Sequence, residues 1–177
     1  MLIDNICNYY YKQAIDCAKK NDVSHALYFL KKIPNSCSFN DKVDKLTALC
    51  LFRLGCYSSC LKKTINNPEY EEVFKQAFND YEEYIKILIE KLKSKEYKLS
   101  LKILLKYSKA SVLEYNMLGC IYVLCNDIKN AQLSFYRALD LDIYNNKTIH
   151  LILSLKDKNE SNSFLIFLKN LFIKQHI

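Results

Sequence analysis

The stretch VLEYNMLGCIYVLCNDIKNAQLSFYRA, residues Val112–Ala138, decides the fold of this chain. On both sides of Asn126-Asp127, apolar residues recur every three or four positions, which is the spacing of one face of an α-helix. Gly119 and Ala131 lie on opposite sides of the turn, and two such small residues let paired helices approach closely. The stretch therefore predicts two antiparallel helices joined by a short turn.

The same turn recurs four times along the chain. Each copy has a polar or turn-tolerant residue, an apolar residue two positions later and a small residue three positions after that. The copies begin at Asn21, Gly55, Lys95 and Asn126. The small residues are 34, 40 and 31 positions apart, and a period near 34 predicts stacked helical repeats with extra residues near 69–80.

Residues 112–145 resemble a tetratricopeptide repeat (TPR). The family pattern of large-x2-Leu-Gly-x2-Tyr followed by Ala-x3-Phe-x2-Ala is carried by Tyr115, Leu118, Gly119, Tyr122, Ala131, Phe135 and Ala138. Ile143 stands where the family has a proline. The resemblance implies an all-α fold, an α-solenoid of about four antiparallel TPR-like hairpins. The units are 7–40, 41–68, 81–110 (degenerate) and 112–145, with C-terminal capping helices over 145–177, all in a single domain 1–177.

Composition agrees with a helical domain. The chain has 177 residues, of which half are hydrophobic and a quarter charged, so it can bury a core and is not a disordered chain. It contains only two Gly and two Pro, too few for the many tight turns of a β-sandwich or for a glycine-rich phosphate loop. Rossmann and P-loop enzymes are therefore disfavoured.

The eight cysteines indicate a reducing compartment, cytoplasmic or nuclear. No Cys-x-x-Cys occurs, most cysteines fall on apolar helical faces, and the first residues do not form a secretory signal. The longest apolar run, within 164–173, contains a lysine and is too short to span a bilayer, so no membrane partner is expected.

Catalysis is not indicated by any constellation of side chains. The three histidines, His25, His150 and His176, are scattered, and no cysteine spacing suits zinc. We predict no catalytic residue, no cofactor and no metal site, and hence a non-enzymatic protein.

The resemblance to TPR proteins implies a protein partner, a peptide or helix, on the concave face formed by the first helix of each hairpin. The corresponding positions are Tyr11, Ile15, Lys45, Leu49, Phe52, Asn116, Cys120 and Val123. This face is mostly apolar, which disfavours the capture of acidic chaperone tails and favours an apolar helix or another subunit. The function predicted is an interaction scaffold or adaptor within a larger assembly.

A stripe of lysines supplies the alternative hypothesis. The net charge is +7, and residues 86–109 hold eight lysines against two acids, next to an acidic segment at 69–83. Lys98, Lys102, Lys106 and Lys109 share one helical face, which could contact the phosphates of RNA or a ribosome. Tyr97 and Tyr107 are expected to point away from it. The other interpretation is a solvated outer face.

The apolar C-terminal helix, about 161–175, leaves self-assembly open as a further alternative, because a terminal repeat normally has a polar outer face.

Overall fold

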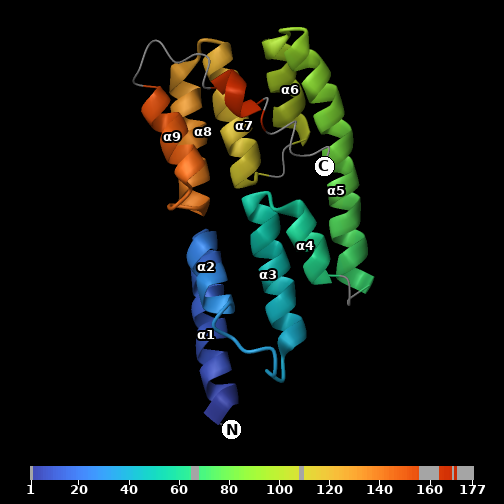
Figure 1. Ribbon diagram of the computed structural model, residues 1–177, viewed down its shortest axis with the longest axis vertical. Coiled ribbons are helices and arrows are strands. Elements are labelled where there is room, and N and C mark those ends of the chain that lie inside the picture. The colour runs from blue at the N-terminus through green and yellow to red at the C-terminus, as the bar shows by residue number, and fades with distance from the viewer. Residues whose placement is uncertain (1, 65–67, 108–109, 156–163, 169, 171–177) are drawn as a thin grey trace. The chain divides into compact units, whose positions relative to one another are not determined.

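The protein is an all-α chain of helical hairpins. The structure, a computed structural model, describes residues 2–64, 68–107, 110–155, 164–168 and 170. Within these ranges every regular element is helical, and nine α-helices are assigned (Figure 1). The predicted all-α fold class and the pairing of helices into hairpins are confirmed.

Contacts divide the chain into two compact units, described separately below. Unit 1 comprises residues 1–79 and 140–143, and unit 2 comprises residues 80–139 and 144–177. The division between the units falls inside two helices, after residue 79 and after residue 139, and the single domain 1–177 stays a prediction.

Unit 1 contains two hairpins. The first pairs α1 (Leu2–Lys19) with α2 (Val23–Leu30), and the second pairs α3 (Asn40–Leu54) with α4 (Tyr57–Thr64). These hairpins correspond to the predicted units 7–40 and 41–68. The first turns of α5 (Pro68–Lys93) complete this unit.

Unit 2 begins with the rest of α5 and continues with α6 (Tyr97–Tyr107), α7 (Val112–Leu124), α8 (Ile128–Leu141) and α9 (Asn146–Ser154). Residues 164–168 are helical as well. Phe164 and Leu168 are buried, and the Phe164 ring stacks on Phe135 with 6.4 Å between centroids. This part of the expected C-terminal helix therefore belongs to the core of its own unit, although much of 161–177 lies outside the described residues.

The four predicted turns share one backbone geometry. The first residue of each turn has a φ between 58° and 80°, in the left-handed region; these residues are Asn21, Gly55, Lys95 and Asn126. The next residue donates its N–H to the carbonyl five positions back at 2.9 Å, as Asp127 does to Tyr122. This is the Schellman end of a helix, and its recurrence confirms the repeat that the sequence predicts.

The small residue of each turn lies in the core of its hairpin. Exposure is 1% or less at all four positions, which are Ala26, Cys60, Ser100 and Ala131. Gly119 serves the same purpose on α7, because a Cβ added there would lie 2.6 Å from two atoms of the Phe135 ring. The TPR-like positions therefore serve to pack the helices of each hairpin together.

The helix α5 departs from the predicted third unit. Pro68, expected to end the second unit, is instead the first residue of α5, a position that suits a residue without an N–H. The extra residues near 69–80 add helical turns, and Phe74 and Phe78 pack on Phe52 and Tyr57 with ring centroids 5.6 and 6.4 Å apart. The unit 81–110 thus has a first helix that starts at residue 68.

Candidate functional site

The predicted partner-binding face in unit 1 is partly open. Tyr11 and Ile15 on α1 are half-buried, and the Tyr11 ring lies 5.4 Å from Phe39. Leu49 on α3 keeps 48% of its surface exposed, a large fraction for a leucine. An apolar side chain of a partner could cover Leu49 directly.

Two other residues of the predicted partner-binding face, Lys45 and Phe52, contact side chains of α5. Lys45 Nζ donates to the hydroxyl of Tyr70 at 2.7 Å and lies 4.1 Å from the centroid of the same ring. Phe52 packs against Phe74, as described above. The start of α5 therefore contacts both residues, although Lys45 stays exposed and Phe52 is half-buried.

In unit 2 the prediction needs a correction. Asn116 is 3% exposed and Cys120 is fully buried, so neither side chain offers a surface to a partner. The Thr148 hydroxyl of α9 lies 2.9 and 3.0 Å from the two amide atoms of Asn116, so Asn116 joins α7 to α9. Val123 is half-buried. The capping helix occupies this part of the first-helix face.

The lysine stripe is exposed on α6. Lys98, Lys102 and Lys106 all have solvent-exposed side chains, and Lys109 lies outside the described residues. The Tyr107 ring stacks on Tyr84 of α5, and Lys106 Nζ lies 4.9 Å from the centroid of the same ring. Tyr107 therefore contacts both α5 and one lysine of the stripe.

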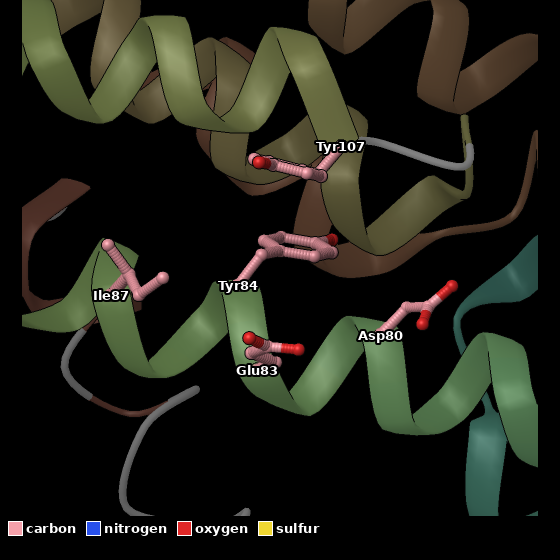
Figure 2. A pocket seen from close by; sticks show the side chains of 5 residues that line it. All are labelled: Asp80, Glu83, Tyr84, Ile87 and Tyr107. Carbon is pink, nitrogen blue, oxygen red and sulfur yellow. The ribbon is translucent and has the colours of Figure 1, made fainter.

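A pocket between α5 and α6 is a second candidate site (Figure 2). Its volume is about 330 Å³, and its described lining residues are Asp80, Glu83, Tyr84, Ile87 and Tyr107. The Tyr84 and Tyr107 rings are nearly parallel, with an interplanar angle of 12° and centroids 5.9 Å apart. The two carboxylates lie on α5 at the edge of this aromatic wall.

The wall is anchored by a buried carboxylate. Tyr84 is 3% exposed and its hydroxyl donates to Glu114, which is fully buried. Glu114 also accepts bonds from the Ser111 N–H at 3.1 Å and the Ser111 hydroxyl at 2.9 Å. The Glu114 N–H in turn donates to the Ser111 hydroxyl at 3.3 Å, which completes a capping box at the start of α7. Ser111-x-x-Glu114 is visible in the sequence, but its link to Tyr84, 30 residues earlier, is not.

Groups that could carry chemistry are apart. In the part of the chain that the structure describes, no three His, Cys, Asp or Glu residues are grouped to hold a metal ion. His25 Nδ1 lies 2.7 Å from Asp22 Oδ2, a contact that accompanies the cap of α2. Burial raises the pKa of the Cys50 thiol to about 11 and that of Cys60 to about 12, so neither is an activated nucleophile.

The repeated Schellman turn, the buried small residues and the contact between Gly119 and Phe135 together define a protein of helical hairpins, and these hairpins resemble TPR units. Among solved structures, the chain is similar to one described as "MamA RS-1 ArsTM double mutant". The two share 20% of residues over 96% of each chain, with a TM-score of 0.37. No protein-family model and no curated protein matches the chain. The assignment therefore rests on the hairpin geometry.

Over the same described ranges, none of the helices combines the length and the hydropathy that crossing a membrane requires.

Proposed function

We propose that this chain is a non-enzymatic scaffold or adaptor that holds a peptide or helix of a protein partner against the first-helix face of unit 1. The observation that carries the proposal is the exposure of Leu49 on α3, together with the half-buried Ile15 and Tyr11 on α1. Covering apolar surface is favourable by about 25 cal/mol per Å², and buried apolar anchors dominate protein interfaces.

A matched pair of variants tests this proposal. Leu49→Glu places a charge on the proposed face, and Leu133→Glu places the same charge on α8, where Leu133 is also 48% exposed. The tagged protein and both variants are used to capture partners from a lysate of the source cells, with and without nuclease. We expect proteins that are recovered with nuclease, lost with Leu49→Glu and retained with Leu133→Glu.

Equal recovery by the two variants would contradict a binding face at Leu49. Melting temperatures of both variants serve as the control for folding. Partners that disappear with nuclease would support the second candidate function.

That second candidate is binding of RNA or a ribosome through the lysine stripe, favoured by the exposure of Lys98, Lys102 and Lys106 on one helix. Its test replaces these three lysines with glutamate and measures the affinity for a labelled single-stranded RNA at two salt concentrations. The control variant makes the same charge change at Lys12, Lys31 and Lys62, which are also exposed. A selective loss with the stripe variant, and a steep salt dependence, would support this function.

A further inference from the structure

The pocket between α5 and α6 combines an aromatic wall with an acidic rim. Of its five described lining residues, two are tyrosines and two are carboxylates, and none is basic. Glu83 has an exposed side chain, whereas Asp80 is half-buried at the other end of the rim. Negative charge beside aromatic faces is the arrangement that attracts an organic cation.

The exposed part of the aromatic wall is Tyr107. Tyr84 is 3% exposed and stacks on Tyr107 at an interplanar angle of 12°, with 5.9 Å between the ring centroids. Tyr107 keeps 43% of its surface exposed and Ile87 keeps the same fraction. A flat group in the pocket can therefore contact Tyr107 and an apolar side chain, which Figure 2 shows among the lining residues.

The buried Glu114 side chain fixes one part of the aromatic wall. It accepts a hydrogen bond from the Tyr84 hydroxyl, which holds that end of the Tyr84 ring in place. The bonds from Ser111 hold Glu114 in turn, so the wall of the pocket is preorganised.

The chain itself shows that the wall accepts a positive charge. Lys106 Nζ lies 4.9 Å from the centroid of Tyr107, within the range of about 6 Å for cation–π contacts. Lys106 does not line the pocket. The described lining of the pocket therefore contains no cationic side chain of the chain itself.

We propose that this pocket binds the guanidinium group of an arginine side chain of the protein partner. Arginine suits it better than lysine, because a planar guanidinium stacks on an aromatic face while it donates two parallel hydrogen bonds to a carboxylate such as Glu83. The alkyl stem of the arginine would lie along Ile87. The source of the arginine rests on the proposed scaffold function, whereas binding of the guanidinium group does not.

The test uses N-acetyl-arginine amide as the probe, titrated into the full chain labelled with ¹⁵N and followed by amide chemical shifts at physiological salt. N-acetyl-citrulline amide is the control probe, because citrulline has almost the same shape and no charge. We expect saturable shifts with the arginine probe at residues 80–87 and at Tyr107, and at least threefold weaker binding of the citrulline probe.

Two variants of equal charge identify the site. Glu83→Gln removes a carboxylate of the rim, and Glu82→Gln removes its exposed neighbour, which does not line the pocket. We expect Glu83→Gln to weaken binding of the arginine probe at least threefold and Glu82→Gln to leave it unchanged. Equal effects of the two variants, or equal binding of the two probes, would overturn the proposal.

This experiment is independent of the scaffold proposal. Binding of the arginine probe would stand even if Leu49→Glu had no effect on partner capture. Conversely, a partner lost with Leu49→Glu would support the scaffold even if the arginine probe failed to bind.

Discussion

Replacing Gly119 with alanine is expected to destabilise the protein, against the ordinary trend for helices. Alanine stabilises a helix interior relative to glycine by about 1 kcal/mol, and Gly119 lies inside α7. The added Cβ, however, would lie 2.6 Å from two atoms of the Phe135 ring, whereas carbon atoms in contact are normally about 3.5–4.0 Å apart. The ring would have to move by about 1 Å.

Phe135 has little room for that movement. Its side chain is fully buried and stacks on Phe164, with 6.4 Å between the ring centroids. Overpacking of a core costs about 1–3 kcal/mol, and contact with several ring atoms places this site at the upper end. After subtracting the gain in helix propensity, we expect a net loss of about 2 kcal/mol and a fall in melting temperature of about 4–8 °C.

The assay is urea unfolding followed by circular dichroism at 222 nm, for the wild type, Gly119→Ala, Phe135→Leu and the double variant. We expect the double variant to be more stable than the sum of the two single losses indicates, because leucine removes the ring that alanine contacts. A Gly119→Ala protein more stable than the wild type would refute the close-packing argument for this hairpin.

Three further predictions concern stability and are checked by urea or thermal unfolding. Lys95→Gly should stabilise by about 1 kcal/mol, because Lys95 has a φ of 58°; Asn126→Gly, at a φ of 60°, should gain less, since asparagine tolerates this conformation. Thr148→Val should cost about 1–3 kcal/mol by leaving the buried Asn116 amide without its hydroxyl partner, and stability equal to the wild type would contradict this. Burial raises the pKa of the Cys60 thiol from 9.0 to about 12, so this thiol ionises at a lower pH in the unfolded chain than in the folded one. The free energy of unfolding should therefore decrease as the pH rises from 9.0 to about 12, and this decrease should be smaller in Cys60→Ala.

The helical hairpins were predictable because their signals are local. Asn21, Gly55 and Asn126 are residue types that accept a left-handed backbone, and each stands where an apolar pattern is interrupted. Lys95 does not belong to these types, and it was identified only by its register with the other turns. A repeat therefore made one weak turn predictable from three stronger ones.

The full length of α5 is hard to predict because acidic residues are interspersed with its apolar ones. The apolar stripe of Phe74, Phe78, Tyr81, Ile85 and Leu88 has spacings of four, three, four and three, which is a helical period. The acids between these positions mask that period, and a proline can follow the end of one helix or occupy the first position of the next. The structure shows that Pro68 is at the start of α5.

The candidate sites were harder to predict, because they depend on contacts between distant segments. Residue spacing places Asn116 on the first-helix face of its hairpin, but only the position of Thr148, 32 residues later, determines that this face is covered. Tyr84 and Glu114 likewise meet across 30 residues. A single sequence contains no signal that pairs such positions.

The repeated Schellman turn also has a consequence for how the chain folds. Each turn joins two helices that are neighbours in sequence. The contacts expected to form first are therefore those within a hairpin, between residues separated by less than the length of one repeat, about 35 positions. Chains with such low contact order fold on the microsecond to millisecond scale. Because a repeat chain can nucleate in any unit, the α7–α8 hairpin, with its tightly interlocked Gly119 and Phe135, is the expected starting point of folding.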